Sequence, residues 1–569
     1  MIETDDYDRL SADIISKHSF ENLPECPDVS NLLDFLDQTK SIIQRRWVDH
    51  MVTNIMAMPE STEKRTLFQI FKNEKGLRSL LEKENFRELE MLRLLGQGPL
   101  WREIVSQISQ REIVTSLLAK HYVAHLSETD LAKFHFSRQE ISLFLDLGLS
   151  VQEPIDSAFV HQLKIADSPD GKNIGQHSRH FGYEYLYGET TPFKDVFRDD
   201  FLQLVNTLKY FSERIREKAF LGYLPPVYEK LANYLNTLAI SFGSNETEAE
   251  SLVRIWENVD KEYLDLVSAG CPIILNPWGF LVDGNHVGIE LMVTLNLAES
   301  SRWYTDSQNY LATVKNFMND QGLDFEPLPF VHQYVFVRNG INIPWTGTAC
   351  AGDRFVVFYD NENDHFSNHL YQTYYDKFVD GTTSQERFTY VRGLNTVAHE
   401  TGHLGRMLDQ ELYQKMGVGV SVGKLDEAKA DSMANLLFLR QSFELPSNVA
   451  PEEFIEQYIV DYIDELRNAV GHEQENIGLV WYDFSAKIIL LTLFECGSIL
   501  WNGDKVKVVD GARGVETLAE LGQQIFNLYG QADFDEKAVG AYVKSVEDKV
   551  ASNQNLQRLL AKAAAFQQA

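Results

Sequence analysis

The sequence predicts a mainly α protein with a small β-sheet, an α+β fold built as two lobes. Apolar residues recur at three- and four-residue spacing over most of the 569 positions, as on amphipathic helices. Short stretches rich in β-branched and aromatic residues are confined to about residues 271–360. A chain of this length, with 44% hydrophobic residues, can bury a large core.

The first part of the chain is predicted to be a helical lobe over residues 1–185. From Asp34 to about Leu163, stretches such as FLDQTKSIIQRRW and REIVTSLLAKHYVAHL carry the helical spacing with few glycines. Glycine, proline and polar residues then cluster between Ala166 and Phe193, a composition typical of a long connection. We therefore place a lobe boundary near residue 185, with a second region over 186–569.

The second region is predicted to hold the small sheet, at about 271–360, and then a run of helices. Strands are indicated by CPIILNPWGFLVDG, GIELMVTLNLA, PFVHQYVFVRNG and DRFVVFYDN, which are punctuated by Gly, Pro and Asn. The strand FVVFYDN could present an exposed edge to an extended peptide, or it could be buried within the sheet. After Gln385 the predicted helices cover 386–410, 424–441, 451–470, 477–501, 513–530 and 535–565.

Charge and the lack of targeting signals limit the class of partner. The formal net charge is -31, and so negative a surface repels phosphate backbones and anionic lipid headgroups. The start, MIETDDYDRL, lacks the basic and apolar regions of a secretory signal. The most apolar stretch, IILLTLFECGSILW, is shorter than the roughly 20 residues that a bilayer requires, so we expect a buried helix. We expect no nucleic-acid partner and no membrane association.

The cysteines indicate a reducing compartment. Cys26, Cys271, Cys350 and Cys496 are far apart, so they form neither a disulfide framework nor a C-x-x-C metal knuckle. The simplest interpretation is buried thiols in a cytoplasmic protein.

One short motif carries chemistry. Residues 399–403 read H-E-T-G-H, which places His399 and His403 one turn apart on the same face of a helix. Glu400 lies about 100° around the helix from His399, where it can reach a water molecule without occupying a ligand position. By chance, 15 histidines among 569 residues give roughly 0.4 H-x-x-x-H pairs, and requiring glutamate second lowers this about tenfold. The motif therefore predicts a metal site.

A third metal ligand is expected on the following helix. Catalytic zinc takes three protein ligands and leaves a fourth position for water. In G-K-L-D-E-A-K-A-D-S-M-A-N, Glu427 and Asp431 are four residues apart among strong helix formers. If Glu427 is the ligand, Asp431 can accept the free ring N–H of a ligating histidine. The alternative is a solvated acidic face. The glycine-interrupted stretch from Met416 to Gly423 can turn the chain back between the two helices.

These motifs resemble a known class of enzymes. H-E-x-x-H followed on a later helix by E-x-x-x-D is similar to the gluzincin metallopeptidases. The string L-D-E-A-K-A-D-S-M-A-N-L resembles a segment of the dipeptidyl peptidase III family and its relatives, and L-T-L-F-E-C-G resembles a helix ending further on in that family. The comparison covers residues 386–497. It implies a two-lobed zincin-like fold with one zinc ion per chain, bound by His399, His403 and Glu427, and with Glu400 as the base that activates water.

The chain departs from the family in two places. The family motif is H-E-x-x-G-H, whereas this chain has the five-residue form. The family's histidine that stabilises the transition state aligns near Tyr482, which the resemblance therefore makes the first candidate for the oxyanion donor. Tyr458, Tyr462 and His472 are other candidates on or near the following helices, and Tyr482 could instead be a plain core tyrosine.

The function expected from these residues is zinc-dependent hydrolysis of peptide bonds, in short peptides, with Glu400 as general base. Two alternatives stay open. The same metal site could catalyse a reaction other than peptide hydrolysis, or the chain could be a binding or scaffold protein that retains the site. Glu400 favours catalysis, since a purely structural site has no use for a base beside its ligands.

Overall fold

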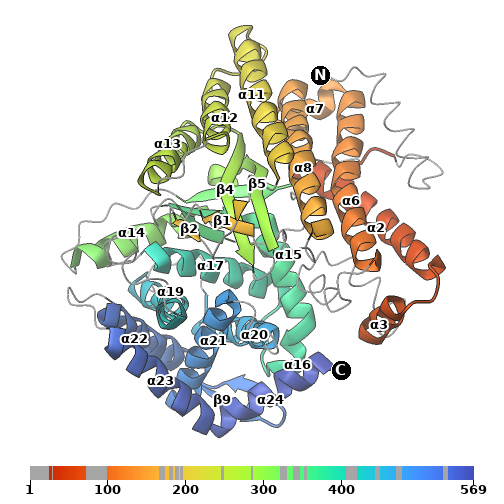
Figure 1. The fold of residues 1–569 in the computed structure, drawn as a ribbon. Coiled ribbons are helices and arrows are strands. Elements are labelled where there is room, and N and C mark those ends of the chain that lie inside the picture. Colours follow the sequence, from red (N-terminus) through yellow and green to blue (C-terminus); the bar gives the residue numbers. More distant parts are fainter. Residues whose placement is uncertain are drawn as a thin grey trace. The chain divides into compact units, whose positions relative to one another are not determined.

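The computed structural model places most of the chain in two compact units (Figure 1). The first comprises Met1–Val282, His286–Asn296 and Val335–Pro344, and the second comprises Asp283–Asn285, Leu297–Tyr334 and Trp345–Ala569. The residues described are 25–27, 30–71, 99–165, 174–178, 183–185, 191–192, 197–244, 249–283, 286–320, 330–336, 347–350, 355–404, 420–441, 449–469, 477–529 and 536–568.

The first unit is mainly helical, and the predicted fold class, mainly α with a small sheet, is confirmed for the described chain. It continues past residue 185, the predicted lobe boundary, because helices on either side of that residue, α8 and α11, pack on each other. Its helices are α2 (Leu32–Ala57), α3 (Thr62–Phe71), α6 (Pro99–His125), α7 (Glu128–Phe134), α8 (Arg138–Ile165), α11 (Arg198–Phe220), α12 (Tyr228–Phe242) and α13 (Ala249–Ser268).

The strands of the first unit lie partly where the sequence predicts them. Strands β4 (Ile273–Asp283) and β5 (His286–Asn296) are neighbours and fall in the predicted sheet region. The stretch predicted as a long connection also contains three short strands, β1 (Ile174–Ser178), β2 (Tyr183–Tyr185) and β3 (Thr191–Pro192). Strand β1 pairs antiparallel with β2 and parallel with β3. Pairing between segments, which period and composition do not report, accounts for the difference.

In the second unit, three strands lie side by side in the order β6, β8, β7. Strand β8 (Phe355–Tyr359) pairs in parallel with β6 (Val331–Val335) and antiparallel with β7 (Gly347–Cys350). The stretch FVVFYDN therefore has a neighbour on both sides, and the interpretation as a strand within the sheet replaces that of an exposed edge. Between β5 and β6 the chain also forms η1 (Ala298–Ser300) and α14 (Tyr304–Asp320), inside the region predicted as sheet.

The helices from residue 385 onward agree with the predicted segments to within a few residues at most ends. They are α17 (Gln385–Leu404), α19 (Val420–Gln441), α20 (Pro451–Ala469), α21 (Ile477–Cys496), α22 (Gly511–Tyr529), α23 (Glu536–Ser552) and α24 (Gln554–Gln568). Before them the structure has three helical elements that the sequence did not predict, α15 (Asp360–Leu370), the π-helical turn η2 (Tyr371–Tyr375) and α16 (Asp376–Phe378). Helix α19 starts inside the stretch expected to turn, because a single glycine, Gly423, costs only about 1 kcal/mol within a helix.

The structure interrupts one predicted helix and shortens another. The segment 535–565 is two helices, since the side chain of Asn553 accepts the backbone N–H of Leu556 and caps α24. The segment 477–501 stops at Cys496, because Gly497 takes a φ of 75° that ends the helix. A hairpin of β9 (Ile499–Asn502) and β10 (Lys505–Val508) follows, and Gly503, with a φ of 68°, provides its two-residue turn.

The core of the second unit surrounds α19, α20 and α21. The predicted buried helix is confirmed for the part of the apolar stretch in α21, where Ile489, Leu490 and Leu493 are fully inaccessible, but the end of the stretch lies in β9, where Leu500 is exposed. Gly522 of α22 lies so close to α19 that a Cβ atom there would come 2.8 Å from the carbonyl of Ser432. In the part of the chain that the structure describes, no helix has both the length and the apolar composition to cross a bilayer.

Candidate metal centre

Helix α17 carries the H-E-T-G-H motif over its last two turns. The helix begins after Ser384, whose hydroxyl accepts the backbone N–H of Arg387 and so satisfies one of the free donors of the first turn. His399 and Glu400 are half-buried. His403 lies one turn after His399 on the same helix, and its side chain is outside the described part of the structure.

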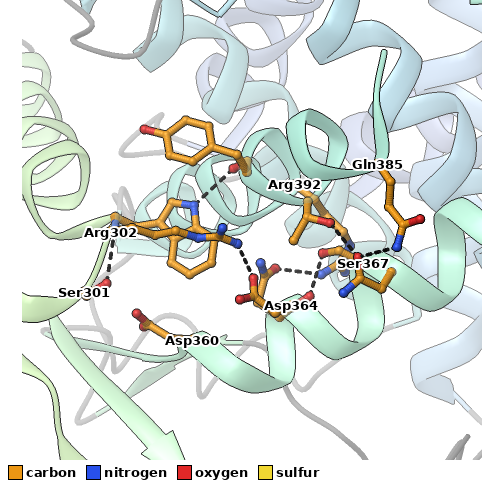
Figure 2. Close-up of polar contacts among 12 residues, drawn as sticks. Ser301, Arg302, Asp360, Asp364, Ser367, Gln385 and Arg392 are labelled. Atoms are coloured by element: carbon orange, nitrogen blue, oxygen red, sulfur yellow. Dashed lines mark hydrogen bonds and ion pairs between the residues drawn. The ribbon is translucent and has the colours of Figure 1, made fainter. Parts of the chain in front are cut away.

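Side chains of α17 fix this helix to its neighbours. Figure 2 shows Arg392 and Gln385 of α17 reaching towards α15. Arg392 donates through Nη1 to Asn363 Oδ1 at 2.9 Å and through Nε to Asp461 Oδ1 of α20 at 3.2 Å. Gln385 donates to Asn368 Oδ1 at 2.9 Å. The helix that presents the motif is therefore held at both its start and its middle.

Helices α17 and α19 cross at a backbone contact. A Cβ atom on Gly402 would lie 2.6 Å from the carbonyl oxygen of Ala430, so only glycine fits at this crossing. The contact brings the motif of α17 beside the acidic positions of α19 (Figure 1). The sequence interpretation gave Gly402 no role, although a glycine inside a helical pattern can indicate close packing of another backbone.

The structure brings His399 together with both predicted acidic residues. Its Nδ1 lies 2.7 Å from Asp431 Oδ1, and its Nε2 lies 3.5 Å from Glu427 Oε2. Because an ionised carboxylate only accepts hydrogen bonds, the contact with Asp431 places a proton on Nδ1 and directs Nε2 towards Glu427. This is the arrangement in which a histidine ligates a metal through Nε2 while a carboxylate fixes its tautomer.

The carboxylates of α19 do not form a solvated face. Glu427 and Asp431 are each only 8% exposed. Removing ionised carboxylates from water is costly unless charged or hydrogen-bonding groups compensate for the loss. The solvated acidic face that the sequence left open is therefore wrong for these two residues.

Tyr482 lies in the electrostatic field of the same carboxylates. The negative charge of Glu427 raises the pKa of this phenol well above its ordinary value, and burial and the charge of Glu400 raise it further. The charges of Glu465 and Asp431 act in the same direction. Tyr482 therefore keeps its O–H in the metal-free chain, as a donor within a region of concentrated negative charge.

Asp431 is held by residues that the sequence interpretation missed. The hydroxyl of Ser485, on α21, donates to Asp431 Oδ2. The backbone carbonyl of Asp431 accepts from Tyr458 Oη at 3.1 Å and from Asn435 Nδ2 at 2.9 Å. Tyr458 was a candidate oxyanion donor, but its hydroxyl already donates to the backbone of α19. Ser485 is the one serine in the apolar helix α21, and a polar residue in such a helix could have indicated a buried hydrogen bond.

These residues fit a zinc ion by their donor set and spacing. Two ligand atoms at about 2.0 to 2.1 Å from a tetrahedral zinc lie about 3.3 Å apart, close to the 3.5 Å between His399 Nε2 and Glu427 Oε2. The clustered carboxylates around Tyr482 also favour a cation. Within the described side chains, which do not include His403, no three His, Cys, Asp or Glu residues already form a metal-binding group. The ligand assignment stays a prediction.

A second histidine in the same unit contacts a serine and an aspartate, as in a Ser-His-Asp hydrolytic triad, but this cluster lies in the core. His332 Nε2 is 2.9 Å from Ser307 Oγ, and its Nδ1 is 3.1 Å from Asp360 Oδ1 and 2.9 Å from Ser301 Oγ. Ser307 and His332 are both fully buried, so the serine is closed to substrate. The cluster satisfies a buried histidine and does not offer a nucleophile.

Comparison with known proteins gives little further evidence. No family model matches the chain, and no curated protein matches it. Among solved structures, dipeptidyl-peptidase III from Corallococcus sp. strain EGB is similar at 12% sequence identity with a TM-score of 0.46, over 75% of this chain and 86% of that chain. A likeness of this size carries no argument about the residues of the site.

Proposed function

We propose that this protein is a zinc-dependent peptidase that hydrolyses peptide bonds in short peptides. His399, His403 and Glu427 would bind the ion, Glu400 would act as general base, and Tyr482 would donate to the oxyanion. The observation that carries the proposal is the position of His399, with Nδ1 at 2.7 Å from Asp431 and Nε2 facing Glu427 at 3.5 Å.

The bound ion would supply a Lewis acid that polarises a substrate carbonyl and makes water more acidic. The protein's own groups carry the remaining steps. Glu400 follows His399 directly and is half-buried, so its carboxylate can take a proton from water and deliver it to the leaving amine. Asp431 holds the ring of His399 in one tautomer. Tyr482, which keeps its proton beside Glu427 and Glu400 in the metal-free protein, would stabilise developing negative charge as a hydrogen-bond donor.

The first test is the metal content of protein purified without added metal, measured by mass spectrometry. We expect about one equivalent of zinc in the wild type and a large loss in His399→Ala and Glu427→Ala. A Glu427→Ala variant that keeps its zinc would remove Glu427 from the ligand set. A wild type that neither contains zinc nor takes it up on titration would overturn the proposal.

The second test separates a peptidase from a metal-binding scaffold. A peptide library is incubated with wild type, with chelator-treated protein and with Glu400→Gln, and the products are sequenced by mass spectrometry. We expect cleavage by the wild type only, restored to the chelated protein by added zinc. Glu400→Gln should keep its zinc and lose activity by about 10²- to 10⁴-fold. Full zinc occupancy without cleavage of any peptide would favour another reaction or a binding role.

A further inference from the structure

Ser485 extends the contact between His399 and Asp431 to a third helix. One carboxylate oxygen of Asp431, Oδ1, lies 2.7 Å from His399 Nδ1, and the other, Oδ2, accepts the hydroxyl of Ser485. The three residues come from α17, α19 and α21. They form a continuous chain of hydrogen bonds that ends at the imidazole ring facing Glu427.

The direction of the Ser485 hydroxyl differs from that of other hydroxyls in these helices. Thr492, two turns later on α21, donates back to the carbonyl of Ile488 four residues earlier. Thr401, on α17, donates in the same manner to Val397. Such bonds within one helix are the ordinary choice for Ser and Thr in helical positions. Ser485 instead donates to another helix, although it is fully buried in α21, the most apolar of the described helices.

The other contacts of Asp431 leave its carboxylate group to be oriented by Ser485. Tyr458 and Asn435 bind the backbone carbonyl of Asp431 and thereby fix the main chain of α19. Neither bond restrains rotation of the side-chain carboxylate. The bond from Ser485 does, because it holds Oδ2 and leaves Oδ1 facing His399.

We propose that Ser485 is a positioning residue for the zinc site: it orients Asp431 so that the ring of His399 keeps its proton on Nδ1 and presents Nε2 beside Glu427. The inference rests on the proposed function. Removal of the hydroxyl lets the Asp431 carboxylate rotate, which lowers the fraction of His399 rings ready to bind the ion. Loss of such outer contacts weakens metal affinity by about 10- to 100-fold in metalloenzymes.

The test is the zinc affinity of full-length Ser485→Ala, measured by competition with a chromophoric chelator. We expect a dissociation constant raised by about tenfold and an altered visible spectrum of the cobalt-substituted protein. Ser432→Ala is the matched control: Ser432 is also fully buried, follows Asp431 directly, and its hydroxyl makes no hydrogen bond within the described structure. This control should retain the affinity and the spectrum of the wild type.

A double variant shows whether Ser485 acts through Asp431. If it does, adding Ser485→Ala to Asp431→Ala causes no further loss of zinc affinity. Equal losses in Ser485→Ala and Ser432→Ala would indicate a general packing defect and overturn the inference. Wild-type affinity and spectrum in Ser485→Ala would overturn it while leaving the zinc site intact. A wild type that binds no zinc would instead overturn the proposed function, and the inference with it.

Discussion

Gly402 and Ala430 are in backbone contact: a Cβ atom on Gly402 would lie 2.6 Å from the Ala430 carbonyl oxygen and 2.9 Å from its Cα. Neither of these atoms can move without moving helix α19. The contact lies one residue before His403 and one residue before Asp431. The separation of the two helices that carry the candidate site is therefore set at this point.

We expect Gly402→Ala to disrupt the site without removing any proposed ligand. The added methyl group forces α17 and α19 apart, an overpacking that destabilises proteins by about 1–3 kcal/mol. The shift separates His399 from Glu427, so zinc affinity should fall by about tenfold or more. Competition with a chelator and thermal unfolding measure the two effects.

Gly540→Ala is the control for this substitution. Gly540 lies inside α23, and a Cβ atom there would meet nothing within 4 Å. Alanine is favoured over glycine within a helix by about 0.5–1 kcal/mol. We expect slightly higher stability and unchanged zinc affinity. A Gly402→Ala protein that behaved in the same way would show that the helices are not in contact at this residue.

Arg392→Met tests the buried charges that fix α17. Asp461 is half-buried, and this burial raises the pKa of its carboxyl group although the charge of Arg392 opposes the shift. Removing Arg392 leaves the carboxylate without its counter-charge. Breaking a fully buried pair costs about 3–5 kcal/mol, which is the upper limit for this pair, because the Asp461 side chain is 19% exposed. Because the raised pKa favours protonated Asp461 in the folded state, the destabilisation should be smaller at pH 5 than at pH 8.

The measurement is the free energy of unfolding in urea at both pH values. Lys544→Met serves as the control, because the Lys544 and Asp548 side chains are 75% and 69% exposed and such pairs contribute about 0–1 kcal/mol. Equal losses in the two variants, or a loss from Arg392→Met that does not change with pH, would contradict the role given to the Asp461 contact.

Cys271 should be unreactive in the folded protein. It is fully buried, and burial raises the pKa of its thiol to about 12. At pH 8 only about one molecule in 10⁴ carries the reactive thiolate. The expected burial is wrong for Cys26, which is exposed, so iodoacetamide should label Cys26 in the native protein and Cys271 only after unfolding. Peptide mass spectrometry distinguishes the two, and rapid native labelling of Cys271 would contradict its burial.

The candidate site could be predicted in part because helical spacing is a local property. His399 and His403 are four residues apart in sequence, and so are Glu427 and Asp431. That the two helices meet was an inference from a glycine-rich connection. Ser485 could not be found in this way, since its contact with Asp431 spans 54 positions and depends on how α21 packs.

Much of the fold could also be predicted because helical spacing is a local property. The errors in the predicted fold come from features that such spacing does not report. Helical periodicity identified the helices from residue 385 onward but missed α14 and α15, and single residues that end or cap helices were overlooked. Gly497 and Asn553 act through one backbone angle and one hydrogen bond, which an average over many residues does not register. The internal position of β8 depends on its pairing with β6 and β7, which hydrophobicity alone does not report.

Tyr482→Phe separates an oxyanion donor from a core tyrosine. In the metal-free protein, the charge of Glu427, then burial and the charge of Glu400, raise the pKa of Tyr482 well above its ordinary value, so the phenol keeps its proton there. Phenylalanine keeps the ring and removes only the donor, whose loss costs about 10²- to 10³-fold in kcat for an oxyanion site. We expect this loss with full zinc occupancy.

A titration of the zinc-free protein and a matched tyrosine complete the test. In the zinc-free protein the charge of Glu427 raises the pKa of Tyr482, so a difference titration of the wild type against Tyr482→Phe should show no tyrosine that ionises at or below the ordinary tyrosine range. Tyr542→Phe is the control: burial raises the pKa of Tyr542 to about 12, and it lies on α23, a helix that carries none of the proposed site residues. Steady-state kinetics on a peptide found in the library would show kcat unchanged in this control. If Tyr482→Phe also kept its kcat, Tyr482 would be a packing residue and the oxyanion donor would lie elsewhere on the chain.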